Sequence, residues 1–271
     1  MNKTVRIATA ADLVPMTWVL IGASPLDPIY PYRFPDSGLY TNEFAELCRQ
    51  KCAEYLATST VIVCEMADDQ DPGRSRVVAF GSWDAPHIPT ANTFGRGMHP
   101  QPTLESLIAT SFPPLHANPT LPRTEPLSRP ANNPVLPITI GHRDRMNVFR
   151  ERCAASKRDM FDKRYTRGHM FLKILLCHPD YQRRGAGSAL TSWGIEEGRR
   201  LGLNTTVFAS PMGLRLYKKL GFREIGRFRV QLDGDDAFLE IPALVLPPDE
   251  GFSAARRVMH GEGMPLSVAA Y

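Results

Sequence analysis

A short segment that contains two glycines, Gln182 to Gly187, lies between a run typical of a buried strand and a run typical of a helix. The first run, Met170 to Cys177, is apolar and of strand length, and His178-Pro179-Asp180 ends it. From Ser188 onward apolar residues recur at helical spacing as far as Gly202, which is suited to end a helix. The sequence therefore predicts a glycine loop at the point where a strand passes into a helix.

Such a loop suits an anion, and a pyrophosphate in particular. Glycines let a ligand approach the backbone, and the first amides of a helix have no partners within it and carry the positive end of its dipole. Arg183 and Arg184 add formal charge. A turn whose glycines only satisfy backbone geometry explains the loop equally well, so the neighbouring motifs decide. The loop lacks the third glycine of the dinucleotide fingerprint and the Gly-Lys-Ser/Thr of a Walker loop.

The segment from Met170 to Phe222 resembles the GNAT superfamily of acyl-CoA-dependent N-acetyltransferases, in particular fungal-type members without an assigned substrate. The loop matches that family's Gln/Arg-x-x-Gly-x-Gly/Ala pattern, and Ala209-Ser210-Pro211 with Leu216 to Phe222 resembles its next strand and helix. The resemblance implies an α/β fold with a mixed, mainly antiparallel central sheet, helices on both faces and a splayed central strand. It also implies acetyl-CoA as the acyl donor, and no metal.

The resemblance further implies which residues hold the acetyl-CoA. Amides near the end of the central strand would bond the pantetheine arm and the acyl oxygen, and the loop would bond the pyrophosphate. Ser210 stands where many members carry an asparagine that holds the cofactor arm, so its contact departs from the family pattern. The expected cofactor-binding residues are Leu175, Leu176, Cys177, Gln182, Arg183, Arg184, Gly185, Ala186, Gly187, Ser188 and Ser210.

Tyr217 matches the tyrosine of the family's Leu-Tyr-x-Lys-x-Gly-Phe pattern, which implies that its hydroxyl protonates the departing thiolate. With an ordinary pKa of about 10, a tyrosine is protonated at neutral pH, as a general acid must be. The alternative is a core tyrosine packed on Leu176 or Leu220.

The general base is not identified by the sequence. An alkylamine is protonated at pH 7, and removing that proton costs about 4 to 5 kcal/mol. Many relatives place a glutamate on the central strand, where this chain has Lys173. A water chain would serve, and the side chains considered are His169, His178, Asp162 and Glu240.

The expected activity is the transfer of an acetyl group from acetyl-CoA to the primary amine of a small molecule. Two alternatives stay open: acetylation of a protein lysine or N-terminus, and a non-catalytic module that binds acyl-CoA. Basic residues are not gathered with aromatic ones into a stripe, so a nucleic-acid partner is not expected. The chain shows no signal peptide or membrane span, and its five cysteines suit a reducing compartment, which together predict a cytoplasmic protein without a membrane partner.

Periodicity and turn residues predict one domain over 1–271 with two irregular parts. Half of the prolines fall between 85 and 137, which predicts an insertion that acts either as a lid or as a surface excursion. A C-terminal extension covers 247–271. Outside the motif, strands are expected at Thr4–Ala8, Thr60–Ala67, Arg76–Trp83, Thr205–Ser210, Glu224–Leu232 and Ala237–Leu246, and helices at Asn42–Ala57, Arg143–Phe161 and Met212–Leu220.

Overall fold

The computed structural model describes residues 3–38, 41–69, 73–84, 86 and 141–248. The Pro-rich segment predicted over 85–137 and the extension over 247–271 lie outside these residues, apart from Pro86, Pro247 and Pro248. The single-domain organisation and the role of the Pro-rich segment therefore remain predictions.

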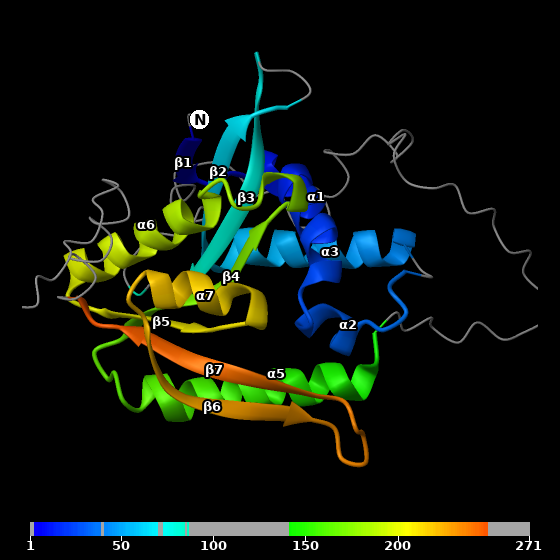
Figure 1. Cartoon of the computed structure of the whole chain (residues 1–271), viewed down its shortest axis with the longest axis vertical. Helices are drawn as coiled ribbons and strands as arrows, with labels where there is room; N and C mark the ends of the chain where they lie inside the picture. The colour runs from blue at the N-terminus through cyan, green and yellow to red at the C-terminus, as the bar shows by residue number, and fades with distance from the viewer. Residues whose placement is uncertain (1–2, 39–40, 70–72, 85, 87–140, 249–271) are drawn as a thin grey trace, which may run out of the picture.

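The strands of the described residues form one seven-stranded sheet in the order β1-β2-β3-β4-β5-β7-β6 (Figure 1). Only β4 and β5 pair in parallel, and the other neighbours are antiparallel. The predicted mixed, mainly antiparallel sheet is confirmed. The strands are β1 (Lys3–Ile7), β2 (Thr60–Ala67), β3 (Ser75–Asp84), β4 (His169–Cys177), β5 (Asn204–Phe208), β6 (Arg223–Gln231) and β7 (Phe238–Leu246).

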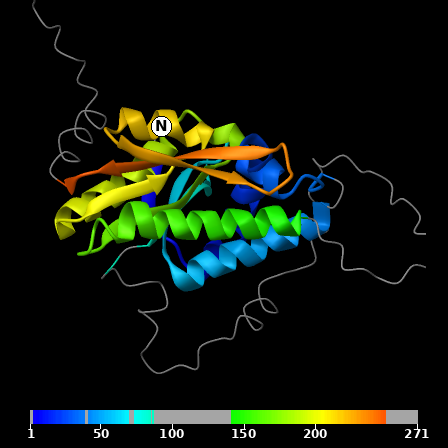
Figure 2. The ribbon, with the colours of Figure 1, turned by 90° about the horizontal axis from the view of Figure 1, so that it is seen from below.

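Helices cover both faces of this sheet, as predicted. The helices are α1 (Leu13–Ala23), α2 (Ile29–Arg33), α3 (Thr41–Thr58), α5 (Arg143–Lys157), α6 (Ala186–Leu201) and α7 (Pro211–Lys219). Alternate side chains of a strand point to opposite faces, so Ile62 and Cys64 join the core beneath α6, while Val61 and Val63 join the core with α1 and α3. Figure 2 shows α3 and α5 on one face of the sheet and α7 on the other.

The predicted elements recur with small shifts that have local causes. Helix α6 begins at Ala186, before the predicted Ser188, because Gly185 caps it with a φ of 87° that few other residues adopt. The predicted helix over Arg143–Phe161 is α-helical to Lys157 and then continues as a π turn. Helix α2 was not predicted, because the prolines around it hide its short periodic pattern.

The central strand β4 separates from its parallel neighbour partway along. Its pairing with β5 runs from His169, opposite Asn204, to Leu172, opposite Val207, and ends there. Beyond this point β4 pairs only with β3, on its other side, as far as Cys177. The predicted splayed strand is confirmed, and the splay leaves one edge of β4 free near the start of α6.

Candidate active site

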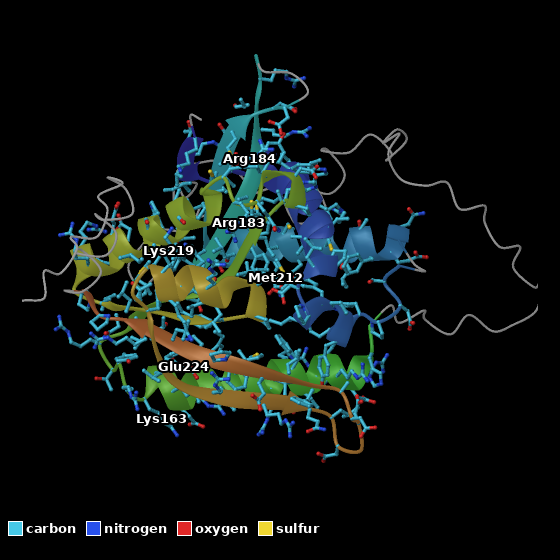
Figure 3. The ribbon with its side chains drawn as sticks, viewed as in Figure 1. Lys163, Arg183, Arg184, Met212, Lys219 and Glu224 are labelled. Atoms are coloured by element: carbon cyan, nitrogen blue, oxygen red, sulfur yellow. The ribbon has the colours of Figure 1, made fainter. Side chains whose placement is uncertain are left out.

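The loop before α6 has the backbone conformation of an anion-binding turn. Arg183 has a φ of 64° and Gly185 a φ of 87°, with Arg184 outside the positive-φ region between them. Such alternation turns successive N–H groups toward one point, and the first amides of α6 follow directly. Figure 3 shows Arg183 and Arg184 beside the first turn of this helix. The loop therefore offers converging donors at the position that the sequence predicted.

Two polar side chains of this loop position it. Arg184 donates to both carboxylate oxygens of Asp69, at 2.9 and 2.8 Å, and to the carbonyl of Asp180 at 2.8 Å. Its charge is therefore already paired, and its part in phosphate binding is limited to the backbone. The amide of Gln182 donates to the Cys177 carbonyl at 3.3 Å and fastens the loop to the end of β4.

A cation that the sequence analysis missed lies against the loop. A Cβ atom added to Gly185 would lie 2.8 Å from the ammonium nitrogen of Lys3, at the start of β1. Glycine therefore gives this ammonium room beside the loop amides, where it can neutralise a phosphate. No local pattern links two residues so far apart in the sequence.

The end of β4 presents free amides toward the splay. The N–H of His178 donates to the Val78 carbonyl of β3 at 2.9 Å. Backbone groups alternate in direction along an antiparallel strand, so the N–H groups of Cys177 and Leu175 point away from β3. By the same alternation, the backbone of Leu176 is used by the β3 ladder and is not available to a cofactor.

The cysteine at this position is not a nucleophile. Burial raises the pKa of the Cys177 thiol to about 12, so the reactive thiolate is scarce at neutral pH. Cys48 and Cys52 are also buried in the core. Within the described ranges, no group of three His, Cys, Asp or Glu side chains could hold a metal ion. In the same part of the chain, no helix combines the length and the apolar character that crossing a membrane requires.

Glycine also allows three elements to meet at the splay. A Cβ atom on Gly187 would lie 3.3 Å from Leu216 of α7 and 3.8 Å from Leu175 of β4. The start of α6, the end of β4 and the side of α7 thus converge. The sequence motif places these segments in order, and the fold brings them together.

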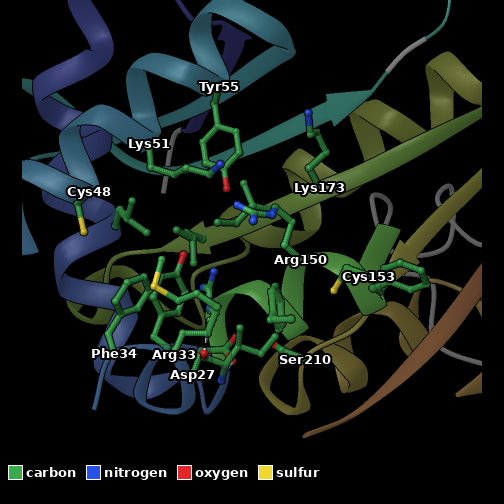
Figure 4. Close-up of a pocket in the computed structure, with 18 of the residues that line it drawn as sticks. Asp27, Arg33, Phe34, Cys48, Lys51, Tyr55, Arg150, Cys153, Lys173 and Ser210 are labelled. Atoms are coloured by element: carbon green, nitrogen blue, oxygen red, sulfur yellow. Dashed lines mark hydrogen bonds between the residues drawn. The ribbon is translucent and has the colours of Figure 1, made fainter. Parts of the chain in front are cut away.

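A cavity of about 870 Å³ adjoins the splay, between β4, α3, α5 and α7 (Figure 4). Of the residues predicted for the site, Leu175, Leu176, Ser210 and Tyr217 line it, whereas Arg183 to Ser188 do not. Much of its wall is apolar or aromatic: Tyr30, Phe34, Phe44, Leu47, Tyr55, Met146, Phe149, Ile174 and Phe208. The loop and the cavity therefore form two separate compartments that share the end of β4.

Tyr217 and Ser210 lie where the cavity meets α7. Ser210 caps the helix by accepting the N–H of Gly213 at 3.3 Å, and its own hydroxyl hydrogen stays available to a ligand. Tyr217 is only 5% exposed and packs with Leu220 in the core. Burial raises its pKa above the ordinary value, and the charge of Asp27 raises it further. Its hydroxyl is therefore protonated at neutral pH.

None of the four side chains considered as a base lines this cavity. His169 and Asp162 bond each other at 2.8 Å in a separate cavity of about 360 Å³ at the other end of β4. The ring of His178 stacks on Trp18 with 3.6 Å between centroids. Glu240 is exposed on β7. None of these four side chains therefore lies at the cavity that adjoins the splay.

The structure places another carboxylate there, that of Asp27. This residue lies just before α2, and its Oδ1 accepts the N–H of Ile29 at 3.1 Å. Among the described lining residues the other carboxylate is Glu54, which is paired with Lys51 at 2.7 Å. Within the described ranges, Asp27 is thus the lining carboxylate for which no ion pair is found. The sequence gives no signal for it, because Asp27 stands in a short Pro-flanked turn far from the motif.

Comparison with known proteins agrees with this geometry. Residues 153–224 match the family model described as an acetyltransferase (GNAT) domain. An acetyltransferase from the fungus Stachybotrys chartarum is 34% identical over 74 residues, which are 27% of this chain and 32% of that protein. The chain thus matches about a third of the length of this curated relative.

The chain is similar to solved structures at low sequence identity. A mosquito protein from Aedes aegypti, assigned as arylalkylamine N-acetyltransferase 7, has a TM-score of 0.51 and 13% identity, with 91% of this chain and 88% of that chain covered. A Corynebacterium glutamicum protein described as histone acetyltransferase HPA2 and related acetyltransferase has a TM-score of 0.48 and 19% identity, with 92% and 97% covered. The family model falls on the loop, the splayed strand and α7, so residues 153–224 of this chain are similar to an acetyltransferase (GNAT) domain.

Proposed function

We propose that this protein transfers an acetyl group from acetyl-CoA to the primary amine of a small molecule. The observation that carries the proposal is the free edge of β4, where the amides of Leu175 and Cys177 lie between the anion-binding loop and the cavity. A thioester at this edge would meet amides that can hold its carbonyl oxygen, with an enclosed space beyond it for the amine.

The loop fits the pyrophosphate of acetyl-CoA on structural grounds. Its two left-handed residues turn amides toward one point, and Lys3 supplies a cation where Gly185 leaves room. The residues that would hold the cofactor are Arg183 to Ser188 through their backbone, Lys3 through its charge, and Leu175, Cys177 and Ser210 near the acyl group. The bound acetyl-CoA supplies an activated acetyl thioester.

The cavity residues have separate roles in the transfer. Asp27 attracts the ammonium form of the amine and accepts its proton, directly or through water. The freed amine nitrogen forms a bond to the acetyl carbon while the carbon–sulfur bond breaks, and the amides of Leu175 and Cys177 stabilise the negative charge on the carbonyl oxygen. Tyr217 donates its proton to the departing sulfur, so that a neutral thiol leaves. The acetylated nitrogen then loses its second proton, which returns through water to the Tyr217 oxygen, and the proton on Asp27 passes to solvent.

A product assay tests this proposal. The protein is incubated with acetyl-CoA and a panel of small primary amines, and acetylated products are identified by mass spectrometry. We expect at least one N-acetylated amine and an equal amount of free CoA. Acetylation confined to peptide lysines or N-termini would favour a protein substrate, and acetyl-CoA binding without any product would favour a non-catalytic module. Either result would contradict the proposal.

A further inference from the structure

The cavity carries more positive than negative side chains. Five lining cations face two lining carboxylates among the described residues. The cations are Arg33, Lys51, Arg143, Arg150 and Lys173, and the carboxylates are Asp27 and Glu54. Like charges repel in a partly enclosed space, so this lining disfavours a ligand with several positive charges and attracts one with an anionic group.

Arg33 holds its charge in the middle of the aromatic wall. Its guanidinium lies 4.7 Å from the ring centroid of Tyr30, 5.2 Å from that of Phe34 and 4.6 Å from that of Phe149. Its Nε donates to the Ile29 carbonyl at 3.2 Å, which fixes the side chain, and its terminal N–H groups make no hydrogen bond to another described residue. In the described part of the chain, Arg33 makes no ion pair with a carboxylate. A fixed planar fork without a counter-ion fits an oxyanion.

Two further cations reach into the same space. Figure 4 shows Lys51 on α3 and Arg150 on α5, with their side chains directed into the cavity. Lys51 is paired with Glu54, but among the described residues Arg150 bonds the neutral amide of Asn147, at 2.9 Å. Arg150 therefore adds a positive charge to the cavity that Arg33 also lines.

Asp27 and Arg33 lie at the two ends of the short helix α2, where both bond the backbone of Ile29. Asp27 Oδ1 accepts the Ile29 N–H at 3.1 Å, and Arg33 Nε donates to the Ile29 carbonyl at 3.2 Å. The cavity lining therefore offers a carboxylate and a guanidinium from one element. A small ligand that carries both an amine and an anion matches this pair of opposite charges.

We infer that the acceptor is a small amine that also carries an oxyanion, a carboxylate or a phosphate, which binds Arg33 with the help of Arg150. This inference rests on the proposed acetyl transfer and specifies its substrate class. The aromatic side chains of the cavity would contact the apolar body of the acceptor. Diamines and polyamines are excluded as preferred substrates, because their second ammonium would lie among the cations.

A matched panel of amines tests the substrate class. Linear amines of equal length are compared that end in a carboxylate, a phosphonate, a methyl group or a second amine, together with aminomethylbenzoate and benzylamine. We expect kcat/KM for an oxyanion-bearing amine to exceed that of its methyl or unsubstituted counterpart by about tenfold or more, as a charge-assisted hydrogen bond contributes. Equal values, or a preference for the diamine, would overturn the inference.

Variants of Arg33 then test whether this residue binds the oxyanion. Arg33→Met keeps an unbranched apolar side chain of similar length against the rings but removes the charge, and it should raise KM for the oxyanion-bearing amine about tenfold with little change for the uncharged amine. Arg152→Met is the matched control, because Arg152 lies on α5, does not line the cavity, and should change neither value. If Arg33→Met does not fold, Arg150→Gln, at an exposed position, should raise KM for the oxyanion-bearing amine by a smaller factor.

The two proposals fail in different ways. Acetyl-CoA affinity, measured by calorimetry, should be the same in Arg33→Met as in the unmodified protein, because Arg33 lies away from the loop. A loss of that affinity would assign Arg33 to the cofactor and overturn the inference while acetyl transfer still stands. The absence of any acetylated amine would reject the proposed function itself.

Discussion

The ring of Tyr217 lies against Gly213, one helical turn earlier in α7, so closely that a Cβ atom on Gly213 would lie 2.7 Å from Cε2 of the tyrosine. Gly213 also donates its N–H to the Ser210 cap. The absence of a side chain here lets the ring pack into the helix while its hydroxyl remains at the cavity. The position of the proposed acid thus depends on a neighbour that has no chemistry of its own.

Gly213→Ala should therefore lower turnover, although alanine is the better helix former by about 1 kcal/mol. The added methyl group displaces the Tyr217 ring from the cavity edge. Turnover at saturating acetyl-CoA and the melting temperature are measured together, with Met212→Ala, an exposed residue of the same helix, as the control. Unchanged turnover in a folded Gly213→Ala variant would show that turnover does not depend on the position of the Tyr217 ring.

Tyr217→Phe should reduce turnover on the order of 10²-fold with little change in acetyl-CoA affinity, because it removes the proton donor and keeps the ring. Burial raises the pKa of Tyr217 above its ordinary value of about 10, so its deprotonation should not lower the rate below about pH 10. If Tyr217 only packs in the core, turnover should be normal in Tyr217→Phe and should fall only in Tyr217→Ala.

Asp27→Asn should lower turnover at pH 7 by about tenfold to 10²-fold, because the asparagine still accepts the N–H of Ile29 but cannot take a proton. The deficit should shrink as the pH approaches the pKa of the amine, about 10.4, where the free base is abundant. Asp36→Asn, an exposed neighbour that does not line the cavity, serves as the control. A deficit that is absent, or equal at all pH values, would remove Asp27 from proton transfer.

Gly185→Asp should weaken acetyl-CoA binding by about 10- to 100-fold, since it places a carboxylate beside Lys3 and the loop amides in competition with the pyrophosphate. Gly202→Asp is the matched control: that glycine is also left-handed, with a φ of 64°, and has nothing within 4 Å of an added Cβ. Calorimetry on both folded variants separates loss of the site from backbone strain. Equal affinities would take the loop out of the cofactor site.

Replacement of residues from about Pro89 to Asn133 with a short Gly/Ser linker should leave cooperative melting intact. The segment has little apolar periodicity with which to offset the entropy of ordering it. Thermal unfolding with and without the segment checks this prediction. Loss of the transition would show that the segment belongs to the core, whereas normal melting with lost activity would support a lid.

The sequence alone determined the strand at Met170, the loop from Gln182, the helix after it and the Tyr217 motif, because each depends on the spacing of neighbouring residues. Periodicity separates strand from helix, and glycine marks the backbone turns, so these signals are local. The splay of β4 was also anticipated, through the resemblance to a family.

Only the tertiary structure decided which side chains share the site. Lys3 of β1 lies beside Gly185 before α6, and Asp27 and Arg33 at α2 share one cavity with Arg150 of α5, although the elements of each group are far apart in the chain. The tertiary structure also pairs Arg184 with Asp69, and it places His169 at the end of β4 that lies away from the splay. Charge and hydrogen bonding act through space, so the pairing of a charged side chain depends on how the helices pack against the sheet, which no local pattern specifies.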